Sequence, residues 1–181
     1  MTTSKAVGEK IDLSIEAKGN VTIEGVEKSA RTEGVAKDYT LTSQTITIRG
    51  DVTELNCLCN QLTSLDVSKS AALEVLFCSE NQLTNLDVSK NTALEELYCT
   101  ENQLTNLNIY RCARLEVLFC FSNCINGEAM TKLVNSLPNR RGMYPGTLSI
   151  VSRFSKKNDK NRCNAADVTT ARKKNWEVLK I

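Results

Sequence analysis

Apolar and polar positions in the middle of this chain recur with a period of 21 residues. Leucine, cysteine and asparagine each fill one position of the period four times. These columns are Leu55, Leu76, Leu97 and Leu118, then Cys57, Cys78, Cys99 and Cys120, and then Asn60, Asn81, Asn102 and Asn123. A unit this short cannot bury its own apolar face, so neighbouring copies must stack and share one core. The pattern therefore predicts an α/β solenoid.

Each repeat contains two short segments in which apolar and polar residues alternate. Leu76-Phe77-Cys78 represents the first segment and Leu86-Asp87-Val88 the second. Alternation with a period of two is typical of a strand whose apolar members point inward. We therefore expect one strand on each of two flanks of every repeat.

Glycine and proline divide the chain into three predicted segments. Neither residue occurs between Gly50 and Gly127, the interval that the repeats occupy. The segments are an N-terminal β cap at 1–50, the 21-residue repeats at 51–126 and α/β capping repeats at 127–181. The β cap is predicted from alternating apolar residues and turn signals. These alternating stretches are Ile11-Leu13-Ile15, Val21-Ile23 and Ile46-Ile48.

Beyond Gly127 the repeat lengthens, because two helical segments are inserted. Leu148-Ser-Ile150 lies 30 residues after Leu118-Phe-Cys120, and Trp176-Glu-Val178 lies 28 residues further on, which predicts two more aligned strands. The first helix is expected from Glu128 to Leu137. The second is expected to begin after Asn164, with Asp167 completing a variant of the capping box. Such strand-helix units would cover the last repeat.

The repeats resemble those of a known family. The columns Leu-x-x-Leu-x-Cys-x-x-Asn-x-Leu match the leucine-rich repeat signature, and Leu-Asp-Val-Ser recurs at 65–68 and 86–89. Over roughly 51–126 the chain resembles the cysteine-ladder repeats of internalin J-like bacterial surface proteins. The resemblance implies a right-handed coil with a parallel β-sheet, and a non-enzymatic adhesive or recognition role at the cell surface or in secreted form. The start at Met1 carries no secretory signal.

The asparagine and cysteine columns have structural explanations. An inward amide can donate to and accept from backbone groups of neighbouring turns. The four column cysteines stack along a line about 4.8 Å apart instead of converging on a point, so buried thiols are favoured over a metal site. No metal or other cofactor is expected. The remaining cysteines are left open between free thiols and a disulfide, for example between Cys124 and Cys163. These are Cys59, Cys112, Cys124 and Cys163.

Side chains flanking the first segment of each repeat form the candidate ligand site. They should face outward from the sheet as aromatic and acidic columns, and exposed apolar patches usually mark interaction sites. The candidates are Phe77, Tyr98, Phe119 and Phe121, with Glu74, Glu95, Glu96 and Glu116. A purely structural role for these rings is given equal weight. A further column, Asp66, Asp87 and Asn108, is expected to hydrogen-bond turn backbone rather than bind calcium.

Charge is unevenly distributed along the chain. Residues 1–139 carry 12 Lys/Arg against 18 Asp/Glu, and residues 140–181 carry 11 against 3. A solvated surface is favoured over a polyanion site, because no aromatic residues are interleaved for base stacking, and nucleic acid is not an expected partner. The basic residues are Arg140, Arg141, Arg153, Lys156, Lys157, Lys160, Arg162, Arg172, Lys173 and Lys174.

The sequence favours a binding module over an enzyme. It contains no histidine and no recognisable nucleophile with its base, and its apolar runs are too short to insert in a membrane. The leading hypothesis is a protein- or glycan-recognition module that binds through the aromatic and acidic face, with a monomer favoured. The alternative is a structural spacer or assembly domain with no dedicated ligand.

Overall fold

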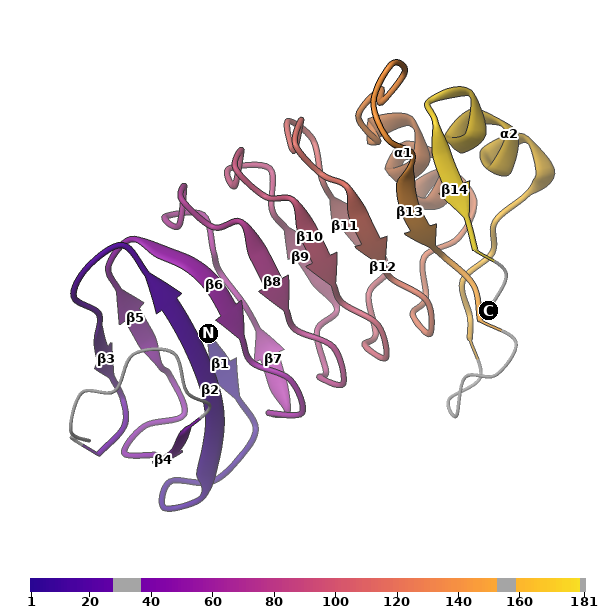
Figure 1. Ribbon diagram of the computed structural model, residues 1–181. Helices are drawn as coiled ribbons and strands as arrows, with labels where there is room; N and C mark the ends of the chain where they lie inside the picture. Colours follow the sequence, from indigo (N-terminus) through magenta and orange to yellow (C-terminus); the bar gives the residue numbers. More distant parts are fainter. Residues whose placement is uncertain (28–36, 153–158, 180–181) are drawn as a thin grey trace.

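The dominant feature of the chain is an eight-stranded sheet (Figure 1). The structure is a computed structural model, and its described residues are 1–27, 37–152 and 159–179. The strand order is β14-β13-β12-β10-β8-β6-β2-β4, and the six strands from β6 to β14 are parallel to their neighbours. These six are β6 (Val52–Asn56), β8 (Val75–Phe77), β10 (Glu96–Tyr98), β12 (Val117–Phe119), β13 (Gly146–Ser149) and β14 (Trp176–Val178). The predicted parallel sheet of repeats is therefore confirmed.

The register of the sheet follows the 21-residue period. Leu97 pairs with Leu76 on one side and with Leu118 on the other, and all three side chains are fully buried. The predicted leucine column is thus the central line of the core beneath this sheet.

The second segment of each repeat lies on another flank of the molecule. Strands β9 and β11 pair in parallel there, whereas β7 pairs with the N-terminal β1. These strands are β1 (Thr2–Thr3), β7 (Leu62–Ser64), β9 (Asn85–Asp87) and β11 (Asn106–Asn108). Each repeat therefore contributes to both flanks, as predicted.

The N-terminal residues close one end of the main sheet with antiparallel strands. Strand β2 pairs with both β4 and β6, and β3 pairs with β5 in a separate two-stranded sheet. These strands are β2 (Lys10–Ala17), β3 (Thr22–Glu24), β4 (Lys37–Thr40) and β5 (Thr47–Arg49). Ile11 and Leu13 of β2 are buried and join the core of the repeats.

The asparagine column forms a ladder of buried amides. The Asn81 Oδ1 atom accepts from the backbone N–H groups of Asn60 and Leu62 at 3.1 and 2.9 Å. Its Nδ2 donates to the carbonyls of Cys57 and Cys78 at 2.9 and 3.1 Å. The inward orientation predicted for this column is confirmed, and each amide joins two successive repeats.

The ladder has a fifth member that the 21-residue period does not identify. The Asn161 Oδ1 atom accepts from Ile125 N–H at 2.7 Å, and its Nδ2 donates to the Cys120 and Ile150 carbonyls at 2.9 and 2.8 Å. Asn161 is 1% exposed. The same backbone problem is therefore solved in the C-terminal units by an asparagine outside the period.

The four column cysteines line the core as buried thiols. Each is fully buried, and all eight cysteines of the chain are free. Burial raises the pKa of Cys57 to about 12 and raises those of Cys78 and Cys99 well above their ordinary value. These thiols stay protonated near neutral pH, as expected of a structural ladder.

Cys112 belongs to a second, shorter ladder. Its Sγ donates to the Val88 carbonyl at 3.3 Å, in the position where Asn91 Nδ2 donates to the Val67 carbonyl at 2.9 Å one repeat earlier. A thiol thus replaces an amide at this point of the period.

Two helices follow the repeats. They are α1 (Gly127–Ser136) and α2 (Ala165–Lys173), close to the predicted ranges. Asn164 caps α2 with the expected reciprocal hydrogen bonds: its side chain accepts from Asp167 N–H at 2.8 Å, and its own N–H donates to the Asp167 carboxylate at 3.1 Å. Within the part of the chain that the structure describes, no helix is long and apolar enough to cross a membrane.

The predicted alignment of the last strand is wrong by two residues. Leu148 pairs with Val178, and Trp176 instead lies beside Gly146. A Cβ atom on Gly146 would meet Trp176 Cε3 at 2.7 Å, so the absent side chain leaves the space that the indole ring needs. Trp176 is 2% exposed, and its Nε1 donates to the Pro138 carbonyl at 2.9 Å.

Candidate functional site

The outward face of the main sheet is built from the residues on either side of each buried leucine. Because side chains alternate along a strand, both neighbours of Leu76, Leu97 or Leu118 point away from the core. They form two rows across the paired strands, with intermediate burial throughout. The aromatic row is Asn56, Phe77, Tyr98 and Phe119, and the second row is Glu54, Val75, Glu96 and Val117.

The aromatic row is a continuous stack of rings. Phe77 and Tyr98 lie with centroids 4.7 Å apart and planes at 12°, and Tyr98 and Phe119 lie 5.3 Å apart at 60°. The Tyr98 hydroxyl donates to Glu96 Oε2 at 2.8 Å. Burial and this carboxylate raise the pKa of Tyr98 to about 12. The three rings are therefore held in place by one another while remaining partly exposed.

Phe121 lies in the turn after β12 rather than in the stack. It is partly buried, and the ring contacts recorded within the described ranges join only the other three candidate aromatics. Its carbonyl accepts from Asn123 Nδ2 at 3.3 Å. The structure thus brings together three of the four aromatic candidates.

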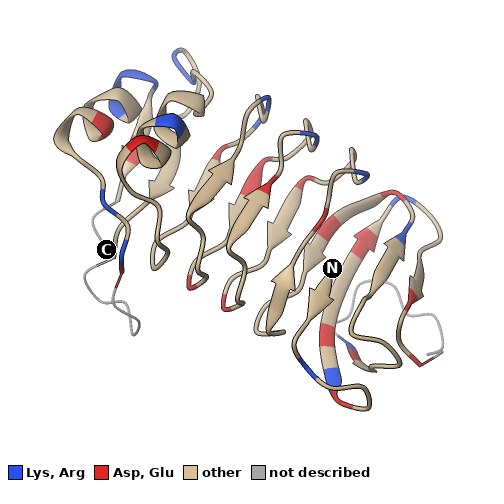
Figure 2. Cartoon of the chain, turned by 180° about the vertical axis from the view of Figure 1, so that it is seen from behind, with Lys and Arg blue, Asp and Glu red and all other residues tan. Residues whose placement is uncertain are grey.

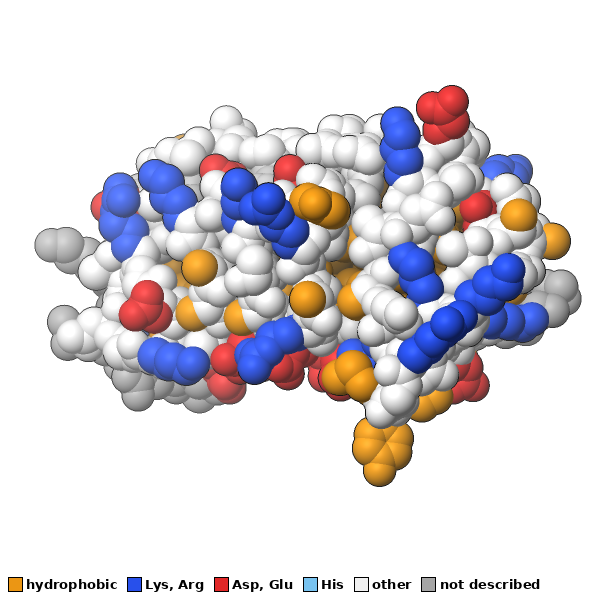
Figure 3. Space-filling view, turned by 90° about the horizontal axis from the view of Figure 1, so that it is seen from above, with side chains coloured by type: hydrophobic (Ala, Val, Ile, Leu, Met, Phe, Trp, Pro, Cys, Tyr) orange, Lys and Arg blue, Asp and Glu red, His pale blue; other side chains and the backbone are white. Residues whose placement is uncertain are grey.

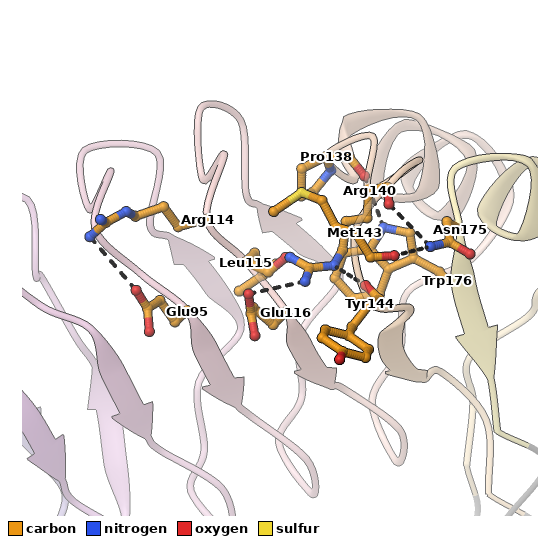
Figure 4. A network of polar contacts seen from close by, with 10 residues as sticks. All are labelled: Glu95, Arg114, Leu115, Glu116, Pro138, Arg140, Met143, Tyr144, Asn175 and Trp176. Carbon is orange, nitrogen blue, oxygen red and sulfur yellow. Dashed lines mark hydrogen bonds and ion pairs between the residues drawn. The ribbon is translucent and has the colours of Figure 1, made fainter.

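Three of the four acidic candidates form ion pairs. Glu74 pairs with Lys18 at 3.5 Å, Glu95 with Arg114 at 3.7 Å, and Glu116 with Arg140 at 3.0 Å. Figure 4 shows the second and third of these pairs beside β10 and β12. This row lies just before strands β8, β10 and β12, and its negative charge is largely neutralised by cations within the molecule.

A different set of carboxylates carries negative charge on the sheet face without a cation. Glu16 of β2 and Glu54 of β6 are direct cross-strand partners. Burial, and next the carboxylates of Glu16 and Glu96, raise the pKa of Glu54 above its ordinary value. Among the described residues, no lysine or arginine lies within ion-pair distance of Glu16, Glu54 or Glu96. We call these three residues the acidic trio.

Arg140 does not belong to the solvated basic surface in which the sequence placed it. It is 3% exposed, and its guanidinium donates to the Leu115 carbonyl at 3.2 Å, to the Tyr144 carbonyl at 3.2 Å and to Glu116 at 3.0 Å. The physical reason is that these buried carbonyls need donors, which a planar guanidinium supplies in several directions. No sequence signal marked this role, because Arg140 lies outside the repeat period.

Other members of the basic group also differ from the prediction. Lys174 Nζ donates to the Leu137 carbonyl at 2.7 Å near the C-terminal end of α1, and burial lowers its pKa. Arg153, Lys156 and Lys157 lie outside the described residues. Elsewhere, Lys and Arg gather at the turns along one side of the repeats and on the two helices (Figure 2).

The Asp66, Asp87 and Asn108 column organises turns, as predicted. Asp66 Oδ1 accepts from Ser68 N–H at 2.9 Å, and Asp87 Oδ1 accepts from Ser89 N–H at 2.8 Å. Hydrogen bonds from Ser68 lower the pKa of Asp66. Within residues 1–27, 37–152 and 159–179, no three or more His, Cys, Asp or Glu side chains are grouped so as to hold a metal ion.

Comparisons with known proteins give one informative similarity. No protein-family model matches the chain, and no curated protein matches it. A solved structure described as the functional domain of InlJ from Listeria monocytogenes, which includes a cysteine ladder, is 31% identical with a TM-score of 0.50. The match covers 67% of this chain, but only 23% of that structure.

This similarity agrees with the columns that the sequence and the structure share. The chain has a buried column of four thiols, a parallel sheet in 21-residue register and an amide ladder beside it. By these features and by the structural match, the chain is a cysteine-ladder repeat protein similar to InlJ.

Proposed function

We propose that the chain is a non-enzymatic recognition module that binds a partner protein through the outward face of its main sheet. The aromatic row of Phe77, Tyr98 and Phe119 carries this proposal. Ordered, partly exposed aromatic rings are favoured interface anchors, because they supply a large contact area at little entropic cost. The leucine-rich repeats of this proposal form a right-handed coil that serves as the rigid support of the row.

The acidic trio supports a basic segment as the ligand. Like charges placed opposite each other on a sheet destabilise it, and Glu16 and Glu54 are direct cross-strand partners. A bound arginine or lysine would relieve that repulsion and could also lie against the face of Tyr98 or Phe77. The paired acids Glu74, Glu95 and Glu116 are already neutralised, so they contribute less to this selectivity.

The proposed setting is the surface of a bacterial cell or its secretions. This part of the proposal rests on the similarity to InlJ, of which the chain spans 23%. The non-enzymatic role rests on the same similarity and on the regular repetition of the surface residues, which singles out no pair of catalytic groups.

Peptides of defined charge test the ligand class directly. We suggest a panel of otherwise identical peptides of about a dozen residues, in which Arg, Glu or Ser fills alternate positions, together with a glycan array. The Arg peptide should bind most tightly, and its affinity should fall with added salt. Glycan binding without peptide binding would replace the protein ligand with a sugar.

Matched variants assign the binding to the proposed surface. Glu54→Gln with Glu96→Gln should weaken binding of the Arg peptide and reduce its salt dependence. Glu74→Gln with Glu95→Gln removes the same formal charge from the neutralised row and should have a smaller effect. Equal effects of the two pairs would contradict the role of the acidic trio.

A structural spacer is the second candidate, because the contact between Phe77 and Tyr98 and the bond from Tyr98 to Glu96 already give these side chains partners. Binding by none of the peptides or glycans would favour the spacer.

A further inference from the structure

The loop between α1 and β13 is fixed in place on both sides. Asn175 Nδ2 donates to the carbonyls of Arg140 and Met143 at 3.1 and 3.0 Å, and Arg140 Nε donates to the Tyr144 carbonyl at 3.2 Å. Gly142 permits the turn with a φ of 83°. The loop backbone is thus held by side chains from its own buried arginine and from the residue before β14 (Figure 4).

The same loop leaves its largest apolar side chains in solvent. Tyr144 is 90% exposed and Met143 is 58% exposed, and Pro145 beside them is also exposed. The other large apolar residues with high exposure, Val7 and Tyr110, belong to other parts of the molecule. We call Met143, Tyr144 and Pro145 the apolar knob.

A rigid loop with a solvated aromatic tip has the properties of an interface hot spot. Hot spots are enriched in tyrosine, and a side chain whose backbone is already ordered loses less entropy when it binds. A shallow hollow adjoins the knob, and Pro145 contributes to its lining together with Arg172 and Glu177. A partner could therefore contact the knob and fill the hollow at once.

The charge around the knob is positive. Arg141, Arg172 and Lys173 are exposed, and Arg141 Nε donates to the Lys173 carbonyl at 2.7 Å, which places the loop beside the end of α2. Glu177 is the acid in the hollow, whereas Glu116 is paired with Arg140. Figure 3 shows hydrophobic side chains protruding from the molecule and Lys and Arg side chains over the C-terminal units.

We propose that the apolar knob is a second interaction surface, which docks into an apolar pocket rimmed by carboxylates on a partner protein. Charge complementarity selects this partner, because three exposed cations flank the knob. The surface differs from the sheet face in both position and sign of charge, so it stands or falls independently of the proposed sheet ligand.

A displayed library of random peptides provides the probe. Selection on the wild-type chain should enrich peptides that combine Asp or Glu with apolar residues. Synthetic copies should bind about tenfold or more weakly to the Met143→Ala/Tyr144→Ala variant, as expected for a hot spot. Binding should also weaken with Arg141→Glu and with added salt. The substituted side chains are exposed, so thermal unfolding of these variants should match the wild type.

Two further variants make the outcome decisive. Tyr110→Ala removes an exposed tyrosine elsewhere and should leave peptide binding unchanged, as should the sheet-face variant Phe77→Ser/Tyr98→Ser/Phe119→Ser. The proposal is overturned if no such peptides are enriched, or if they bind the Met143→Ala/Tyr144→Ala variant as tightly as the wild type. It is also overturned if sedimentation shows a dimer that this double variant abolishes, because the occupant would then be a second copy of the chain.

Discussion

Residues 51–126 and residues 127–181 contribute parallel strands to one sheet, but they position these strands with different residues. In the first region the supporting amide comes every 21 residues, as in Asn81 and Asn102. In the second region the corresponding amide is Asn161, the indole of Trp176 fills the space beside Gly146, and Arg140 satisfies buried carbonyls. The stacking of strands therefore sets which backbone groups need partners, while repetition is only one way to supply them.

The largest expected difference between the two regions concerns high pH, because the column thiols are concentrated in the repeats. The pKa of Cys57 is raised from 9.0 to about 12 by burial. A raised pKa in the folded state adds stability that is complete below the unfolded pKa and is lost as pH rises toward the folded pKa. Unfolding free energy should therefore fall by about 1.4 kcal/mol per pH unit for each such thiol between about pH 9 and pH 12.

Chemical denaturation under reducing conditions across this pH range measures the effect. Cys99→Ala removes one buried thiol and should make the fall less steep. Cys59→Ala removes an exposed thiol and is the matched control. An equally steep fall in the Cys99→Ala variant would show that other groups cause it.

Next in size is the cost of removing an amide from the ladder. Asn102→Leu and Asn161→Leu should each lower the unfolding free energy by about 1–3 kcal/mol, because buried backbone groups lose their partners. Denaturant titration of both variants sharpens the comparison. Similar losses would show that the two regions share one ladder, whereas a negligible loss for Asn161→Leu would separate them.

A smaller difference is expected between two arginines that pair with acids of the same row. Arg140→Ala should cost about 2 kcal/mol, because it leaves the Leu115 carbonyl without this donor and removes a buried side chain. Arg114→Ala should cost less than about 0.5 kcal/mol, because its pair with Glu95 is exposed. Equal costs, measured by denaturant titration, would contradict the distinction drawn between periodic and individual roles.

The sequence was most informative where geometry and period coincide. The leucine, cysteine and asparagine columns could be predicted, because stacked strands must present the same position every 21 residues. The N-cap of α2 could also be predicted, because the partner of Asn164 lies only three residues away. Local and periodic contacts are both readable without coordinates.

The remaining features depend on contacts between residues with no fixed spacing. Lys18, Arg114 and Arg140 neutralise one acidic row, and each comes from a different part of the chain. For this reason the sequence could not show which carboxylates lack a cation. The two-residue error at Trp176 has a similar cause, because the space beside Gly146 fixes the register rather than the apolar alternation.

The most direct test of the account uses the Phe77→Ser/Tyr98→Ser/Phe119→Ser variant, with unfolding and binding of the Arg peptide measured on the same sample. These rings flank the core rather than form it, so the variant should stay folded and lose about 1–3 kcal/mol, from two ring contacts of about 0.5–1.5 kcal/mol each. It should no longer bind the peptide. An unfolded variant, or a folded one that binds as tightly as the wild type, would contradict the assignment of the sheet face to recognition.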